Sequence, residues 1–219
     1  MNPSSQKEKL DNLVVTIELT LLSVIQGVAL FFLADNARVT LLSLDYEHFV
    51  YLVIAFLFLI IFWSQTIVHV ISFISWPIEF AHTFLYFLVV ILEILMFSSV
   101  ANPSSWFAVN VFFFISIWVL YYADLRLLKT KKQDFMDTEA KKIFYEATLK
   151  DQRAGLFVFT PVGAFFSFVS WFLIAMYPSV FLEGHWHILL GAIEMGIGIF
   201  ILARFMSVFK KRFAVIEGF

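Results

Sequence analysis

The stretch FVYLVIAFLFLIIFWSQTIVHVISFI, residues 49–74, decides the fold class of this chain. It contains no Asp, Glu, Lys or Arg. A helix that rises about 1.5 Å per residue over this length crosses the roughly 30 Å hydrocarbon core of a bilayer. Ser75, Trp76 and Pro77 follow, and proline disfavours continuation of the helix. The stretch therefore predicts a membrane-spanning helix that ends in a tight turn.

Similar apolar stretches fill most of the chain, which is 61% hydrophobic and 15% charged with a mean hydropathy of +0.88. Soluble domains contain about 45–50% apolar residues, so a soluble fold is excluded. We predict an all-α, polytopic transmembrane helical bundle that forms one membrane domain, residues 1–219. Its six spans are expected at about 13–34, 49–74, 78–100, 106–123, 154–177 and 187–209, with a charged loop at 124–153.

The positions of the basic residues orient these spans. When the six spans are laid across a membrane, 14 of the 15 Lys and Arg residues fall on the same side as the two termini, and only Arg38 falls on the opposite side. Basic residues concentrate on the cytoplasmic side of membrane proteins, so both termini are predicted in the cytoplasm. The expected location is the cytoplasmic membrane of a bacterium or archaeon.

The charged loop carries a second helical signal. Its apolar residues recur at helical spacing, and Asp137 and Lys141 form an i,i+4 pair of opposite charge. We therefore predict a cytoplasmic amphipathic helix between spans four and five, which could lie on the inner leaflet and contact a partner or anionic lipid. The apolar residues are Met136, Ala140, Ile143, Phe144 and Ala147.

Composition and motifs exclude several function classes. The chain has no Cys, so it has no disulfide, thiolate metal site or thiol nucleophile. No basic segment with interleaved aromatic residues indicates nucleic-acid binding. Phosphate-binding loops, nucleophile elbows and metalloprotease helices are also absent from the sequence. We therefore predict no catalytic residues and no nucleic-acid partner.

One short stretch resembles a known family. Residues 60–63, Ile-Ile-Phe-Trp, followed by His69 in the second of six spans, are similar to prokaryotic relatives of the lysosomal potassium channel. The identifying Phe-Ser-Asp motif of that family is missing from the first span, where residues 18–23 read ELTLLS. The spacing from Trp63 to His69 also differs, so no pore residue is transferred to this chain.

Polar residues on spans two and three form the first candidate site. His69 precedes the turn at Trp76 by about as many residues as His82 follows it, so an antiparallel pair places both imidazoles at one depth. On each of these two spans the polar residues recur three or four positions apart, so they form a polar stripe along one helix face. The two stripes predict an inner polar vestibule made of Gln65, His69, Glu79, His82 and Tyr86. Proton relay, metal or haem binding, and interhelical hydrogen bonding are the alternatives. No cofactor is predicted, and an absorption spectrum with elemental analysis tests for haem or metal at His69 and His82.

Intramembrane carboxyl groups form the second candidate site. An ionisable side chain inside a bilayer costs roughly 2.5–3.5 kcal/mol on insertion scales and is a functional candidate by default. Glu93 and Glu194 are expected at similar depth in the outer half of the bundle, where they could share a proton or a cation. Glu18 on the first span is the third predicted transport or proton-binding residue. Local hydrogen bonding of each Glu is the structural alternative.

Two functions follow from these sites. The first is a small ion or proton channel, or a proton-coupled transporter, with Glu93 and Glu194 in its core. The second is a non-catalytic membrane scaffold or complex subunit that docks through residues 131–153. The expected partners are the lipid bilayer and either further copies of the chain or another membrane protein. A membrane enzyme is the third hypothesis, because it needs several reactive side chains at one depth, and only His69 and His82 come close to meeting this requirement.

Overall fold

The computed structural model describes residues 3–44, 46–73 and 80–217, and these residues form helices without any β-strand. The α-helices are α1 Pro3–Leu42, α2 Phe49–Phe73, α3 Phe80–Phe97, α4 Pro103–Thr130, α5 Glu139–Ala154, α6 Thr160–Met176 and α7 His187–Glu217. Two 3₁₀ segments, Tyr46–His48 and Lys132–Phe135, and two π-helical turns, Gly155–Phe159 and Ser179–Glu183, connect them. The prediction of an all-α fold is confirmed.

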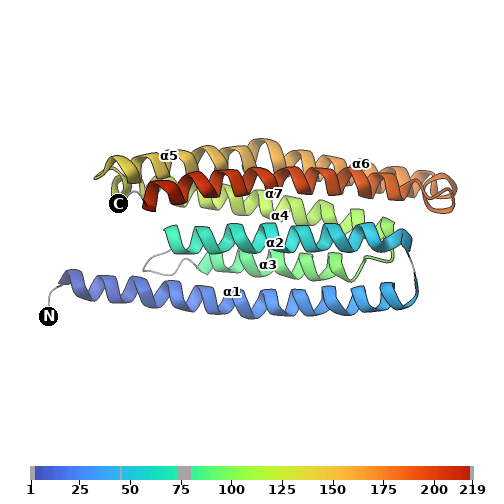
Figure 1. The fold of residues 1–219 in the computed structure, drawn as a ribbon, viewed down its shortest axis with the longest axis horizontal. Coiled ribbons are helices and arrows are strands. Elements are labelled where there is room, and N and C mark those ends of the chain that lie inside the picture. The colour runs from blue at the N-terminus through green and yellow to red at the C-terminus, as the bar shows by residue number, and fades with distance from the viewer. Residues whose placement is uncertain (1–2, 45, 74–79, 218–219) are drawn as a thin grey trace.

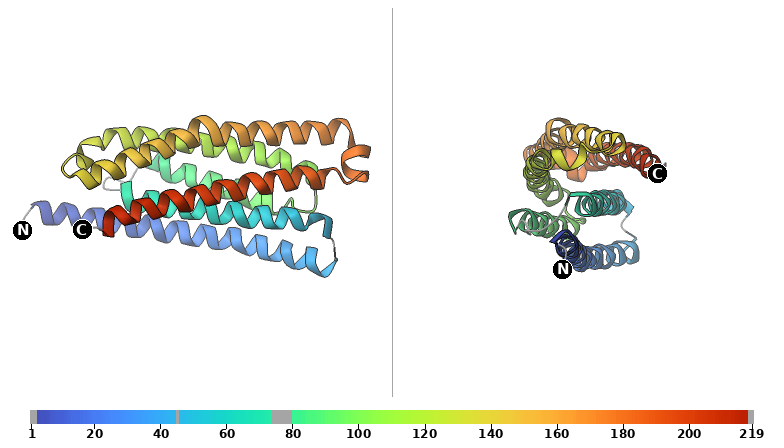
Figure 2. Two further views of the ribbon diagram at one scale, coloured as in Figure 1. Left: turned by 45° about the horizontal axis from the view of Figure 1, so that its top comes forward. Right: turned by 90° about the vertical axis from the view of Figure 1, so that its left-hand side faces the viewer.

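The helices run along one common axis (Figure 1). The helices α2 and α3 lie between α1 and the group formed by α4 to α7, as the end-on view in Figure 2 shows. The start of α1 and the end of α7 lie at the same end of the bundle, which we call the termini end; the opposite end is the far end. The main packing partners are α4 with α6 and α3, α2 with α7 and α1, and α1 with α3.

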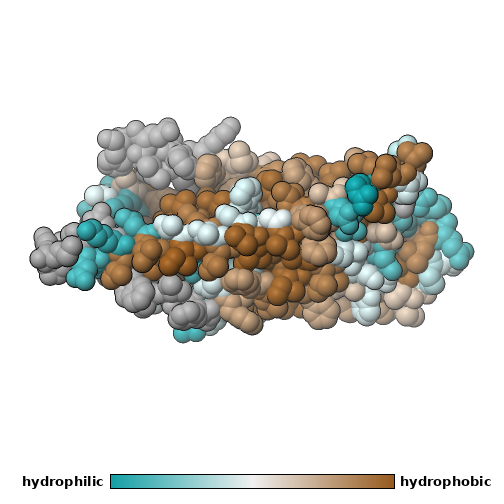
Figure 3. All heavy atoms as spheres, turned by 90° about the horizontal axis from the view of Figure 1, so that it is seen from below, coloured by the Kyte–Doolittle hydropathy of each residue, from teal (hydrophilic) through white to brown (hydrophobic). Residues whose placement is uncertain are grey.

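Among the described residues, five helical stretches are long and apolar enough to cross a membrane: Lys9–Leu42, Tyr46–Phe73, Pro103–Thr130, Glu139–Met176 and His187–Phe209. The apolar helix His82–Phe97 is shorter. On the face shown in Figure 3, hydrophobic side chains cover the middle of the bundle, and hydrophilic side chains gather toward its two ends. The long apolar helices therefore indicate a multi-pass membrane protein.

The structure differs from the predicted boundaries in two places that matter for function. Helix α4 extends to Thr130 instead of ending near residue 123. The predicted amphipathic segment is helical over Glu139–Ala154, but it continues through the π-helical turn into α6 along the same axis. It is therefore not a separate helix between two spans. The predicted pair Asp137 and Lys141 forms a 2.7 Å hydrogen bond, which lowers the pKa of the Asp137 carboxyl.

Helix α1 shows why the bundle needs an apolar environment. Between Val14 and Leu33 its buried residues follow one narrow stripe at spacings of three and four, which faces α2 and α3: Val14, Glu18, Leu22, Gln26, Ala29 and Leu33. The other faces carry large apolar side chains such as Val24 and Phe31, which are 64% and 65% exposed. Exposed apolar surface of this extent is stable in lipid and unfavourable in water.

The α4–α6 interface predicts a strong position effect for glycine replacement. A Cβ atom added at the buried Gly163 would lie 2.6 Å from the ring of Phe114, whereas at Gly196 it would meet nothing within 4 Å. Gly163→Ala should therefore destabilise the protein by about 1–3 kcal/mol through overpacking. Gly196→Ala is the matched control and should be neutral or slightly stabilising. Thermal unfolding in detergent measures both, and equal midpoints would contradict the predicted packing.

Candidate functional site

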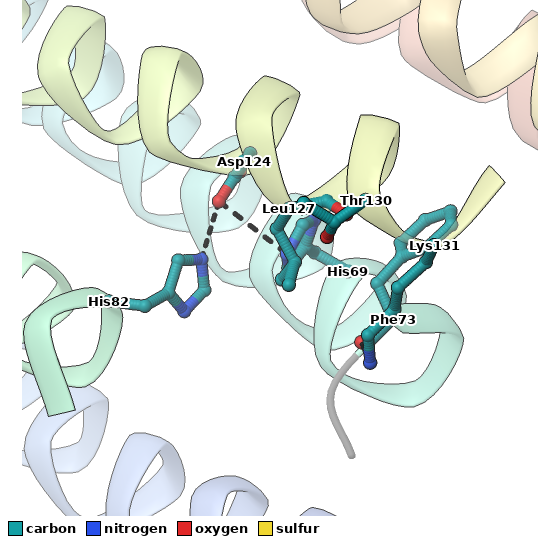
Figure 4. A network of polar contacts seen from close by, with 7 residues as sticks. All are labelled: His69, Phe73, His82, Asp124, Leu127, Thr130 and Lys131. Carbon is teal, nitrogen blue, oxygen red and sulfur yellow. Dashed lines mark hydrogen bonds and ion pairs between the residues drawn. The ribbon is translucent and has the colours of Figure 1, made fainter. Parts of the chain in front are cut away.

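Three helices bring an ionisable cluster together near the termini end (Figure 4). His69 comes from α2, His82 from α3 and Asp124 from α4; they are 6%, 2% and 5% exposed. Nε2 of His82 lies 2.5 Å from Oδ1 of Asp124, and Nε2 of His69 lies 3.5 Å from the same oxygen. The two imidazole rings stack with their centroids 5.0 Å apart. We call these three residues the His–His–Asp cluster.

The His–His–Asp cluster leaves several polar atoms without a hydrogen bond. Within the described part of the chain, neither ring nitrogen of His69 has a hydrogen-bond partner, and Nδ1 of His82 has none. The nearby ammonium of Lys131 donates to the backbone oxygen of Phe73 at the end of α2. Buried polar atoms without partners are costly, so they mark a place where a proton, a water molecule or an ion can bind.

Polar contacts extend from the His–His–Asp cluster toward α1. The rings of His82 and Tyr86 meet edge to face at 4.5 Å. Tyr86 also lies within electrostatic range of Asp124 and of Glu18. Glu18 accepts a 2.5 Å hydrogen bond from the hydroxyl of Thr83, the residue next to His82. Glu18 therefore belongs to the termini-end polar region.

A second buried network surrounds Glu194 on α7. Its carboxylate accepts a 2.8 Å hydrogen bond from Nε1 of Trp106 and a 3.0 Å hydrogen bond from Nδ2 of Asn110, one turn later on α4. The rings of Trp106 and Tyr51 lie 5.3 Å apart. The Tyr51 hydroxyl donates to the backbone oxygen of His187 at 3.0 Å and lies 3.2 Å from its Nδ1. Glu194 is thus linked to the far end of the bundle.

This network reaches a half-exposed cluster at the far end. Nδ1 of His185 lies 2.9 Å from Oε2 of Glu47, and Nε2 of His187 lies 3.9 Å from the same oxygen. The side chains of His185 and Glu47 are 55% and 46% exposed, whereas His187 is 3% exposed. The far-end network therefore runs from the surface at Glu47 into the bundle as far as Glu194.

An aromatic layer and a cavity separate the two polar regions. The ring of Phe58 lies 5.9 Å from that of Phe113 and 5.7 Å from that of Phe114. A cavity of about 100 Å³ begins at this layer and reaches His69 and Asp124. It is bordered by α2, α4, α7 and the α5–α6 helix, and its polar lining includes Gln65, Thr66, Asp151, Gln152, Thr160 and Arg204. The cavity thus connects the aromatic layer with the His–His–Asp cluster.

The structure brings together part of the predicted inner vestibule. It brings together His69, His82 and Tyr86, and it places Gln65 in the cavity wall, whereas Glu79 lies outside the described residues.

Glu93 and Glu194, which are expected at similar depth, have different neighbours in the structure. Glu93 lies beside Gln26 of α1, and Glu194 lies against α4. The reason is the helix order: α3 packs against α1 and α4, whereas α7 packs against α2 and α5. Similar depth along the bundle axis does not bring two side chains together when their helices lie on different sides.

Several central residues were not predicted from sequence. Asp124 was assigned to the charged loop, although Leu125, Leu127 and Leu128 continue the buried pattern of α4 and could have signalled a longer helix. The sequence signal for Asn110 is weak, because it consists of a single amide one turn after Trp106 within an apolar span. Arg204 of α7 also lines the cavity; it lies 3.8 Å from Asp151 and stacks on the ring of Phe159.

The fold and its buried ionisable side chains define a class, an all-helical protein with several helices suited to a membrane. Comparison with protein-family models, curated proteins and solved structures gives no match. Function must therefore be inferred from the chemistry of the site alone.

Proposed function

We propose that this protein moves protons or another small cation across a membrane. The observation that carries the proposal is the pair of buried ionisable regions at different levels along the same helices, with the His–His–Asp cluster at one level and the Glu194 network at the other. Tyr51 and His69 are separated by about 27 Å along α2, at 1.5 Å per residue. Buried ionisable groups are costly inside a bilayer and typically line ion or proton pathways.

In this proposal the chain crosses the membrane six times, with α3 as the short span, and both termini lie in the cytoplasm. The basic residues support this orientation, since nearly all of them fall beside the termini end in the six-span arrangement. The His–His–Asp cluster then faces the cytoplasm and Glu47 faces the outside. We further propose that copies of the chain associate in the membrane, which light scattering of the detergent-solubilised protein would test.

The chemistry of each region suits transfer of positive charge. Imidazole and carboxylate groups bind and release protons, and a carboxylate between two imidazoles holds a cation more tightly than either imidazole would alone. The layer of Phe58, Phe113 and Phe114 separates the two regions and would keep water from forming a continuous column. Movement of α2 relative to α4 would open this layer, because Phe58 lies on α2 and both Phe113 and Phe114 lie on α4.

Flux through proteoliposomes tests this function. Vesicles that contain the protein are loaded with a pH-sensitive dye, and a potassium diffusion potential is set up across their membrane with the inside negative. The interior of these vesicles should acidify faster than that of protein-free vesicles. Glu194→Gln should reduce the rate roughly tenfold, about 1.4 kcal/mol in the transfer barrier, because the residue links the far end to the bundle interior. Glu93→Gln, the matched control on α3, should retain most of the rate.

Two results would argue against the proposal. Equal losses in the Glu93 and Glu194 variants would show that the far-end network has no special role. Wild-type vesicles that match protein-free vesicles for protons, sodium, potassium and divalent ions would overturn transport and favour the scaffold function. In that case neutralising the exposed Lys141 and Lys142 of α5 should release a co-purifying membrane protein.

A further inference from the structure

We propose that the His–His–Asp cluster binds a divalent transition-metal ion such as Zn²⁺ or Fe²⁺. Three helices contribute one ligand atom each, and these atoms all lie within 4.8 Å of one another. Two imidazoles with one carboxylate form a ligand set that suits Zn²⁺, Fe²⁺, Co²⁺ and Ni²⁺. The sequence leaves metal binding at His69 and His82 open as an alternative, but it does not supply the third ligand, because Asp124 lies in a segment expected to form a loop.

The distances within the cluster suit a metal ion. Ligand atoms bound to zinc at about 2.0–2.2 Å in a tetrahedral site are separated by roughly 3.3–3.5 Å. Nε2 of His69 lies 3.5 Å from Oδ1 of Asp124, at the upper end of this range, whereas Nε2 of His82 lies 2.5 Å from the same oxygen and would have to move outward to make room for an ion. Small side-chain rotations of His69 and His82 would bring all three atoms to bonding distance. The 3.5 Å separation is also too long for a good hydrogen bond, which leaves Nε2 of His69 available.

His69 provides an independent indication of a ligand. It is 6% exposed, it points toward Asp124, and among the described residues neither of its nitrogens has a hydrogen-bond partner. A neutral histidine in a protein interior normally donates one ring N–H and accepts at the other nitrogen. A metal ion at Nε2 would satisfy the inward nitrogen. The charge of Asp124 would offset part of the charge of the ion.

The cavity makes the bound ion exchangeable. Structural zinc sites usually have four protein ligands, whereas sites with three protein ligands keep a position open for water or substrate. His69 and Asp124 both line the cavity, which at about 100 Å³ has room for water at the open position. The polar groups Asp151 and Gln152 border the same cavity and could take part in transfer of the ion. Binding can be measured without transport, so failure of either proposal leaves the other testable.

The far-end group Glu47, His185 and His187 offers a built-in comparison. Its ligand atoms also lie within 4.8 Å of one another, but two of its three side chains are about half exposed and its Tyr51 contact occupies one nitrogen of His187. Solvation competes more strongly with metal binding at such a site. We therefore expect tighter binding at the His–His–Asp cluster.

Titration of the purified, tag-free protein with Co²⁺ tests the proposal. Wild-type protein in detergent should bind one ion per chain tightly, with the visible absorption bands of four- or five-coordinate cobalt, and Zn²⁺ should remove the bands. His69→Gln, His82→Gln and Asp124→Asn should each weaken binding at least tenfold. His185→Gln, the control, should change the affinity of this site by less than twofold.

A stability measurement separates lost binding from lost folding. Zn²⁺ should raise the unfolding temperature of wild-type protein and of His185→Gln, and should leave that of His69→Gln unchanged. Circular dichroism before the titration confirms that each variant is helical. The proposal is overturned when wild-type protein binds no Co²⁺, or when binding survives in a variant that lacks His69, His82 and Asp124 together.

Discussion

Asp124→Asn is expected to reduce cation flux roughly a hundredfold, about 2.7 kcal/mol in the transfer barrier. Asp124 contacts both His69 and His82, and no other carboxylate among the described residues does so. Its replacement therefore removes the negative charge on which the cluster depends. The substitution also leaves a neutral amide between two buried imidazoles. We therefore expect a loss of about 1–3 kcal/mol in the free energy of unfolding. Proteoliposome flux and detergent unfolding measure the two effects.

A second variant separates the functional loss from the structural one. Replacing His69, His82 and Asp124 together with leucine removes every buried polar group of the cluster at once. Such apolar replacements of buried charged groups are often neutral or stabilising. The triple variant should therefore unfold near the wild-type temperature and still conduct no cations. Asp134→Asn, in the exposed 3₁₀ segment, is the control and should change neither property. Flux that persists in the triple variant would remove the cluster from the pathway.

The sequence predicts where the helices lie along the chain, but it predicts much less well which helices pack against one another. Apolar length alone predicts the long spans, because a bilayer requires internal backbone hydrogen bonding over a fixed thickness. The sequence positions also bring His69 near His82, because α2 ends at Phe73 and α3 begins at Phe80, so their adjoining ends must lie close together. The extension of α4 past residue 123 was hidden by its charged end, where Arg126 and Lys129 alternate with buried leucines.

Lateral helix order explains the remaining errors. Periodicity gives the depth of a residue and the face it occupies, but not which helix that face meets. Glu18 and Gln26 lie on one stripe of α1 and meet Thr83 and Glu93 of α3, because α1 and α3 run parallel. Glu194 on α7 contacts α4 instead. Glu93 and Glu194 thus belong to different helix interfaces, although the sequence predicts a similar depth for both.

This separation predicts two different outcomes for double-mutant cycles on Glu194. Glu194→Leu leaves the buried donors of Trp106 and Asn110 without an acceptor, and each orphaned donor costs about 1–3 kcal/mol. Asn110→Leu removes one of these donors, so the double variant should be more stable than the sum of the single losses predicts. Measured couplings inside membrane proteins average about 0.6 kcal/mol and reach about 1.7 kcal/mol, and we expect a value in the upper part of this range.

The second cycle combines Glu194→Leu with Glu93→Leu. These two residues contact different helices, so their effects on the free energy of unfolding should add within about 0.5 kcal/mol. Reversible unfolding in mixed micelles measures both cycles under the same conditions. Strong coupling between Glu93 and Glu194, together with none between Glu194 and Asn110, would restore a shared carboxyl site and contradict the helix order described above. The opposite pattern makes Glu194 the acceptor of an α4 network, and it leaves Glu93 to stabilise the contact between α1 and α3.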